Sequence, residues 1–453
     1  MAAVSSVNQS DEQFKQGLAA RQFRGSLWRR FFALSTLIAI AALIALFYNV
    51  VNTAFGYVVS NFEPDINDLA ENGDLDALST TQLAQIIEDY APNTLRVIIR
   101  NNLSTVPQDQ FTKAPLGEVL PPDRFVYPTE WAALTINDLE AHDWTTIIGT
   151  NIAHDTLVHI VRSDIVEEEV LETFTLTESL LERERIEQVH ADEYPNATLY
   201  FRSWVTLDFI VNPGSSDPTL AGIRTALLGS LWVIGITVLF AFPIGVGAAI
   251  YLEEYASNTL FNRLIETNIR NLAGVPSIIY GLLGLAIFVR TLGGLTQGRT
   301  ILSAGLTMGL LILPVIIINS QEALRAVPFS IREGSYGLGA TKWQTIWRNV
   351  LPAALPGILT GTILGVSRAV GETAPLIIVG ASTAILSNTP PDPSSPFASF
   401  TAIPLQIYQW TARPQAEFKT IAAAAIIVLL VVLLTLNASA IILRQRFRRR
   451  LSA

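Results

Sequence analysis

Two ionisable residues lie four positions apart inside a long apolar run of this 453-residue chain, in the stretch GVSRAVGETAPL. Arg368 and Glu372 are the only charged residues between Pro356 and Leu386. An arginine at the centre of a bilayer costs about 2.5–3.5 kcal/mol even on lenient insertion scales. A cost of that size suggests that the side chain has a use.

Two interpretations of the pair remain open. Arg368 and Glu372 can neutralise each other along one helix, a purely structural role. Alternatively, Arg368 contacts an oxyanion, because guanidinium is always charged and offers forked donors that match such oxygens. Glu372 would then hold Arg368 while the site is empty, and Ser367 and Thr373 complete this candidate substrate pathway. Pro375 is predicted to interrupt the helix directly afterwards.

Glycines precede the pair at helical spacing. Gly357, Gly361 and Gly365 form a small-xxx-small track, which predicts close packing of this helix against another. Arg368 and Glu372 continue the track at +3 and +4, so both ions are predicted to face protein and not lipid.

The rest of the chain has the composition of a membrane protein. Half of its residues are hydrophobic and only 15% are charged. Long charge-free runs, each about the ~20 residues that cross a bilayer, together with the run that holds Arg368, predict an all-α polytopic membrane protein with six transmembrane helices. The five charge-free runs cover residues 31–51, 225–252, 272–289, 300–321 and 420–443.

Basic residues predict the orientation of these helices. An N-terminal tail (1–30) and a C-terminal tail (444–453) each carry five Lys or Arg, and the loop before residue 356 carries four more. Both termini and that loop are therefore predicted to be cytoplasmic. A cleaved secretory signal is the other interpretation of residues 31–51, but no small-residue cleavage site is obvious after them.

Residues 52–220 are then an inserted extracytoplasmic domain. They hold 29 Asp and Glu against 8 Lys and Arg, and their mixed helical and alternating patterns predict an α+β fold. This acidity argues against a nucleic-acid partner. No metal site is expected, because His154 and His159 are five residues apart and would not align on one helical face.

The stretch SIREGSYGLGATKWQTIWRNVLP is the most informative segment outside the apolar runs. Ser330 with Glu333, and Thr341 with Gln344, have capping-box spacing, which predicts a helix, a glycine turn and a second helix. An apolar stripe on the second helix suits either a helix lying in the membrane interface or a helix docked in a partner's groove. Its members are Trp343, Ile346, Trp347 and Val350.

The same stretch resembles the EAA loop of ABC-importer permeases. Glu333, Gly339, Leu351 and Pro352 match the register of that motif, within a loop that spans 322–352. Gly334 and Ser335 stand where the motif has two alanines. In the family this loop contacts the ATPase, and the resemblance implies that role for these residues and for Ala340, Thr341 and Trp343.

Further strings resemble the A-type permease subunit of the phosphate-specific (Pst) ABC importer. They are AAIYLEEYA, GVPSIIYGLLGLA, SRAVGETAPL and IPLQIYQW, and the likeness covers residues 220–443. It implies a type I ABC importer permease core (221–443) in a bacterial inner membrane, with inorganic phosphate as cargo. The implied partners are a C-type sister permease, a pair of ATPase subunits and an extracytoplasmic phosphate-binding protein.

ATP hydrolysis is expected to belong to a different chain. No Walker A pattern is present, and none of the four lysines follows a glycine. The chain is therefore predicted to be a transport subunit and not an enzyme, with ATP and Mg²⁺ held by the partner ATPase and no cofactor of its own. Two alternatives stay open: a permease for another oxyanion such as sulfate or molybdate, and a membrane sensor with an extracytoplasmic ligand-binding domain.

Overall fold

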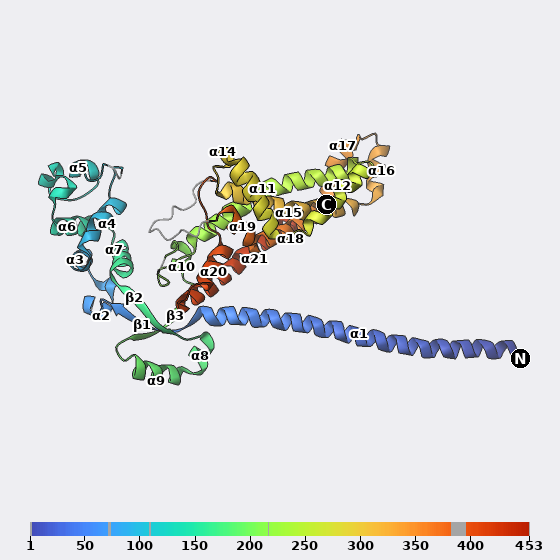
Figure 1. The fold of residues 1–453 in the computed structure, drawn as a ribbon, viewed down its shortest axis with the longest axis horizontal. Helices are drawn as coiled ribbons and strands as arrows, with labels where there is room; N and C mark the ends of the chain where they lie inside the picture. The colour runs from blue at the N-terminus through green and yellow to red at the C-terminus, as the bar shows by residue number, and fades with distance from the viewer. Residues whose placement is uncertain (1, 71–73, 108–109, 216, 382–395, 453) are drawn as a thin grey trace.

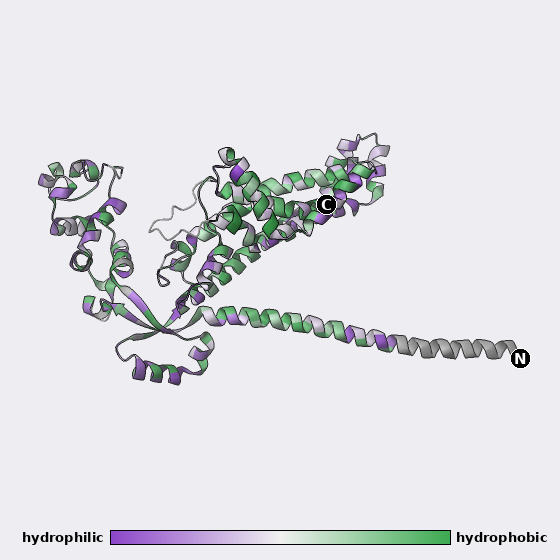
Figure 2. Ribbon diagram, in the orientation of Figure 1, coloured by the Kyte–Doolittle hydropathy of each residue, from purple (hydrophilic) through white to green (hydrophobic). Residues whose placement is uncertain are grey.

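A computed structural model describes residues 2–70, 74–107, 110–215, 217–381 and 396–452 of the chain. Its first element, α1 (Ala2–Ala54), is one continuous helix, so residues 2–30 and the first apolar run belong to the same helix. Figure 1 shows α1 extending away from the remaining long helices. Its apolar part is exposed along most of its length within this chain (Figure 2).

Residues 55–211 hold a small sheet and a set of short helices. The sheet is antiparallel in the order β2–β1–β3, with β1 (Phe55–Glu63) between β2 (Glu167–Thr173) and β3 (Thr198–Ser203). The helices of this region are α2 (Ile66–Leu69), α3 (Thr80–Tyr90), α4 (Leu95–Asn102), α5 (Leu116–Val119), α6 (Ala141–Asn151), α7 (His154–Ile160), α8 (Leu176–Leu181), α9 (Arg183–Glu193) and α10 (Leu207–Val211).

Two larger apolar cores organise this region, beside a smaller one formed by Val59, Phe174 and Ile186. Helices α3, α4, α6 and α7 bury a core of their own, to which Leu83, Ile99 and Ile147 contribute fully buried side chains. A second core joins the sheet region to the membrane helices, because Val58 and Trp204 pack with the buried residues of α20 (Ile403–Thr411) and α21 (Ala416–Ser452). Figure 1 shows α10, α20 and the start of α21 meeting near the sheet.

The membrane-spanning helices number five, or six if one bent pair counts as a span, among the described residues. Helix α11 (Arg224–Ile250) packs on α15 (Ile301–Arg325), and α15 packs on α18 (Leu351–Gly371). Burying these apolar faces against one another forms the core of the bundle. The other two spans lie within α1 and α21.

The run at 272–289, predicted to be a single span, is bent. Helix α12 (Leu260–Ala273) and the helix formed by α13 (Ser277–Gly284) and η8 (Leu285–Thr291) meet at 106°. The bend falls at Gly274–Pro276, because the residue before a proline is pushed out of helical geometry. Hydropathy alone does not detect such a change of direction.

Short helices complete the bundle. They are η7 (Tyr251–Tyr255), α14 (Gly293–Thr296), α16 (Phe329–Gly337), α17 (Lys342–Thr345), η9 (Ile346–Val350) and α19 (Ala374–Val379).

Candidate functional site

The helix that carries Arg368 ends almost immediately after it. Helix α18 stops at Gly371, Glu372 has an extended backbone, and α19 begins at Ala374 with Pro375 in its first turn. The predicted interruption of the helix is therefore confirmed. The helical backbone is lost at Glu372, three residues before Pro375. Arg368 consequently lies in the last turn of α18, where the helix dipole favours a cation, and not in the middle of a span.

The two ions form a loose pair across this break. The Arg368 Nε atom lies 3.5 Å from Glu372 Oε1, and the side chains are 44% and 24% exposed. The glycine spacing predicted that both ions face protein, but within this chain Arg368 lies at the rim of the bundle. A partly exposed pair at this distance contributes little to stability. The arginine is therefore free to contact another group.

A close contact with a neighbouring helix holds the break in place. Helix α19 packs against α13 at Gly281, where an added Cβ would lie 2.9 Å from the Cα of Pro375. Only a residue without a side chain permits this approach. Thr373 precedes α19 and makes no side-chain capping hydrogen bond.

The glycine track packs on α15, as the spacing predicted. A Cβ added at Gly357 would lie 2.7 Å from the Cβ of Ala323, and one at Gly361 would lie 2.2 Å from the Cβ of Asn319. Gly365 has more room, because its nearest neighbours would be 3.7 Å away. The track therefore seats α18 tightly at two of its three positions.

We expect Gly361→Ala to destabilise the bundle by about 1–3 kcal/mol, the usual cost of overpacking. Gly365→Ala is the matched control: it adds the same methyl group to the same helix without a collision, and it should be neutral or slightly stabilising because alanine favours helix. Thermal unfolding of the two purified variants in detergent checks this. Equal melting temperatures would contradict the close packing at Gly361.

A polar seam joins α18 to α21. Ser367 Oγ donates to Asn437 Oδ1 at 2.8 Å, and Arg444 Nη1 donates to Thr360 Oγ1 at 3.0 Å. The two hydrogen bonds are seven residues apart on both helices, so they lie on one face of each. Neither Asn437 nor Arg444 was predicted as part of a site, although Asn437 is the lone amide inside the last apolar run.

The loop before α18 has the predicted helix, turn and helix. Helix α16 ends at Gly337, Gly339 adopts a positive φ of 82°, and the Thr341–Gln344 capping box opens α17. The predicted capping box at Ser330 is wrong, because α16 begins at Phe329 with Pro328 in the N-cap position. Through η9, α17 continues into α18, so residues 342–371 form one helical rod.

The predicted apolar stripe on this rod divides between two environments. Ile346 and Val350 are buried, whereas Trp343 and Trp347 are exposed and stack on each other with ring centroids 5.4 Å apart. A helical apolar stripe is about 100° wide, so one side of it packs inside the bundle here while the other side remains at the surface. The tryptophan pair is therefore available to a membrane surface or a partner.

The residues assigned to the ATPase contact differ in exposure. Leu351 and Pro352 are half-buried at the start of α18, and Ala340 is half-buried beside the turn. Ser335 is buried, and its hydroxyl bonds to Thr345 Oγ1 at 2.9 Å and accepts from Asn349 Nδ2 at 3.1 Å. Ser335 thus joins the loop's two helices. The exposed members are Glu333, Gly334, Gly339, Thr341 and Trp343.

A set of ionic contacts, here called the clasp, fixes this loop to the end of α11. Its members are Glu253, Glu254 and Tyr255 of η7, with Arg325, Arg332 and Lys342 of the loop and its flanks. Arg332 Nη2 lies 2.6 Å from Glu254 Oε1, and these side chains are only 11% and 7% exposed. Arg332 also donates to the carbonyls of Leu324 and Val327 at 3.0 and 2.8 Å.

The outer contacts of the clasp are more exposed. Arg325 forms a two-pronged pair with Glu253 at 2.7 and 3.1 Å, and Lys342 lies 5.1 Å from the centre of the Tyr255 ring. Three successive residues of η7 therefore each hold one cation from the loop. The string YLEEYA predicted only a family resemblance, and this structural role of its residues was not predicted.

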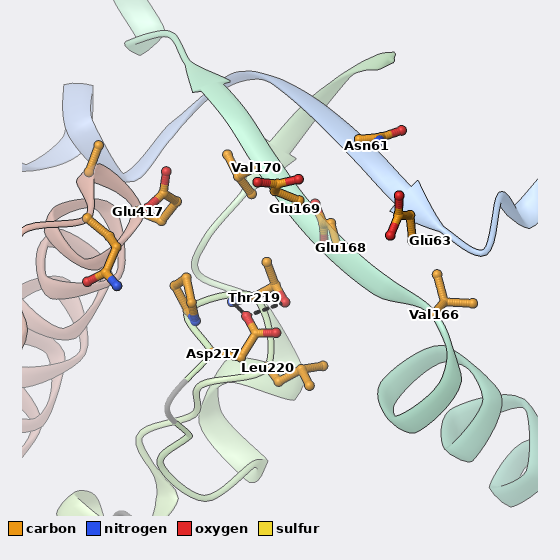
Figure 3. A pocket seen from close by; sticks show the side chains of 13 residues that line it. Asn61, Glu63, Val166, Glu168, Glu169, Val170, Asp217, Thr219, Leu220 and Glu417 are labelled. Carbon is orange, nitrogen blue, oxygen red and sulfur yellow. Dashed lines mark hydrogen bonds between the residues drawn. The ribbon is translucent and has the colours of Figure 1, made fainter. Parts of the chain in front are cut away.

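A separate cavity of ≈ 700 Å³ lies where the sheet meets the start of α21 (Figure 3). One of its carboxylates, Glu168, is paired with Arg202 at 2.7 Å, and another, Asp217, accepts from Thr219. An anion is disfavoured in such an acidic cavity, so Arg368 remains the candidate anion contact. The acidic residues that line the cavity are Glu63, Glu168, Glu169, Asp217 and Glu417.

The bundle of long apolar helices is that of a multi-pass membrane protein. Residues 241–452 match the family model described as "Binding-protein-dependent transport system inner membrane component". The chain belongs to this family.

Three relatives illustrate the likeness. The probable ABC transporter permease protein YqgH of Bacillus subtilis is 34% identical over 40% of this chain and 59% of that protein. YqgI of the same organism is 33% identical over 47% of this chain and 73% of its own length. The phosphate transport system permease protein PstA of Haemophilus influenzae is 30% identical over 51% of this chain and 79% of that protein. The chain thus spans under two thirds of the first relative.

Proposed function

We propose that this chain is a permease subunit of an ATP-driven phosphate importer. Its relatives include a protein named as a PstA phosphate permease, which it matches over 79% of that protein's length. We propose that a C-type sister permease forms the pathway with it, that an extracytoplasmic protein delivers phosphate, and that a separate ATPase dimer holds ATP and Mg²⁺.

One observation carries the mechanism. The rod 342–371 runs without interruption from the exposed Trp343 to the turn that holds Arg368. At 1.5 Å per residue such a rod is about 45 Å long. A partner that moves the loop at Trp343 and the Gly339 turn therefore moves Arg368 as well, which links ATP hydrolysis to the anion contact.

In this proposal Arg368 is the anion contact and Glu372 is its alternative partner. The 3.5 Å separation within the pair is long for a charged hydrogen bond, so the guanidinium can exchange the carboxylate for a phosphate at little cost. A transport site must release its cargo, and Glu372 provides the competition that makes binding transient. Ser367 directly precedes Arg368 inside α18, and Thr373 directly follows Glu372 at the break.

We further propose that both termini are cytoplasmic and that residues 52–220 form an extracytoplasmic α+β domain in a bacterial inner membrane. The basic tails support the first part. The sheet and surrounding helices of residues 55–211 support the second.

Uptake of labelled phosphate tests the substrate and the coupling together. A strain lacking this chain should lose ATP-dependent uptake and regain it with the full-length chain, and the purified chain should bring down an ATPase subunit. Excess unlabelled sulfate or molybdate should not compete. Competition by either would identify another oxyanion as cargo, and an absent ATPase subunit would favour a sensor.

A further inference from the structure

Helix α8 exposes two large apolar side chains beside the end of the first membrane span. Leu180 and Leu181 are 71% and 79% exposed, among the highest values for leucine in the described residues. Figure 1 places α8 at the junction between α1 and the sheet. An exposed apolar pair at such a place requires an explanation.

Hydrogen bonds tie α8 directly to α1. The Asn52 side-chain oxygen accepts from the backbone N–H of Thr177 at 2.7 Å and from its hydroxyl at 2.6 Å. The hydroxyl groups of Tyr48 and Thr177 also form a hydrogen bond. The apolar run of α1 ends at Val51, directly before Asn52. Helix α8 therefore contacts α1 where the apolar run ends, which is the position at which a spanning helix leaves the hydrocarbon.

The orientation of α8 is fixed from its other side. Ser179 is buried, donates to the carbonyl of Thr175 at 2.7 Å and accepts from the backbone N–H of Tyr57 on β1 at 2.8 Å. Glu178 closes a capping box with Thr175. The polar side chains of α8 are thus engaged with the protein, and the two leucines are the side chains that remain outside.

The surroundings of the leucines suit a membrane surface. Tyr57 and Phe201 pair edge to face with ring centroids 5.6 Å apart, and Arg183 lies 5.8 Å from the Tyr57 ring. Aromatic and arginine side chains of this kind concentrate where membrane meets water. Two carboxylates next to the leucines are paired, Glu187 with Arg183 and Glu182 with Arg185. These two ion pairs reduce the repulsion that an acidic segment would meet from anionic headgroups.

We propose that Leu180 and Leu181 insert into the lipid interface at the C-terminal end of α1, so that α8 anchors the sheet to the bilayer. The bilayer is the occupant that the geometry favours, because α8 is bonded to a membrane-spanning helix at the level where its apolar run ends. The proposal depends on α1 spanning the membrane. It does not depend on the cargo or on which side of the membrane the sheet lies.

The natural absence of cysteine makes a direct test simple. Leu181→Cys in the full-length chain is labelled with a nitroxide and reconstituted into vesicles of phosphatidylethanolamine and phosphatidylglycerol. The rates at which two relaxing agents collide with the nitroxide are then compared. Oxygen concentrates in lipid, whereas a nickel chelate stays in water. Glu184→Cys on α9 is the matched control, because Glu184 is exposed only three residues away.

The expected result is a ratio of oxygen to nickel collisions that is several-fold higher at position 181 than at position 184. Equal ratios, with nickel reaching both labels, would overturn the proposal and place the leucines in water. Shielding of position 181 from both agents would also overturn it, because a protein partner and not lipid would then cover α8. Circular dichroism of each labelled variant checks that the fold is retained.

Discussion

Replacing Arg368 with glutamine is expected to abolish phosphate uptake while leaving the transporter assembled. Assembly should survive because the side chain is 44% exposed and its pair with Glu372 is loose, and such pairs contribute only about 0–1 kcal/mol. Transport should fail because glutamine cannot supply a charged, two-pronged contact. Hydrogen bonds to charged groups are worth about 1.5–3 kcal/mol each, so losing two lowers uptake at least about a hundredfold.

The measurement is initial uptake of labelled phosphate, with co-purification of the ATPase subunit as the check on assembly. Arg290→Gln is the matched control, since Arg290 is also an exposed arginine in the last turn of a membrane helix and forms no ion pair among the described residues. It should transport normally. Normal uptake by Arg368→Gln would remove Arg368 from the pathway, and joint loss of uptake and assembly would give it the structural role.

The sequence predicted the parts of this site that depend on local backbone chemistry. Pro375 disfavours a continuous helix through the preceding residues and is well accommodated in the first turn of α19. The Thr341–Gln344 capping box forms from residues three apart. The track at Gly357 and Gly361 was equally readable, because the spacing that puts glycines on one face is a property of the helix itself.

Features that depend on distant partners were not predictable in the same way. Nothing local to Ser335 indicates that its hydroxyl joins Thr345, and the bend at Gly274–Pro276 required knowing which way the chain turns. The exposure of Arg368 illustrates the limit best. Spacing put it on the glycine face, but within this chain its side chain is 44% exposed.

The clasp is the strongest example, because its two ion pairs join residues that are 72 and 78 positions apart in the chain. Its buried half, Glu254 with Arg332, fixes α16 to the end of α11. If a partner displaces the loop, the displacement reaches the membrane helices only through the points at which the loop is attached to them. The clasp therefore attaches the loop to a second helix, in addition to the rod that leads to Arg368.

Glu254→Gln is expected to weaken both stability and transport strongly. It leaves the Arg332 guanidinium buried beside a neutral group, and removing one partner of a buried pair typically costs about 3–5 kcal/mol. The neighbouring variant Glu253→Gln is the matched control. Its partner Arg325 is 58% exposed, so the same change there should cost only about 0–1 kcal/mol.

Thermal unfolding of the purified chain and ATP-driven uptake in reconstituted vesicles distinguish the two variants. Glu254→Gln should melt at a clearly lower temperature and lose most of its uptake, whereas Glu253→Gln should resemble the unmodified protein in both assays. Arg332→Lys should fall between them, because lysine keeps the charge but cannot reach Glu254 and the carbonyls of Leu324 and Val327 together. If the two glutamine variants behaved alike, burial would not decide the strength of the clasp, and the loop would have to act on the spans through the rod alone.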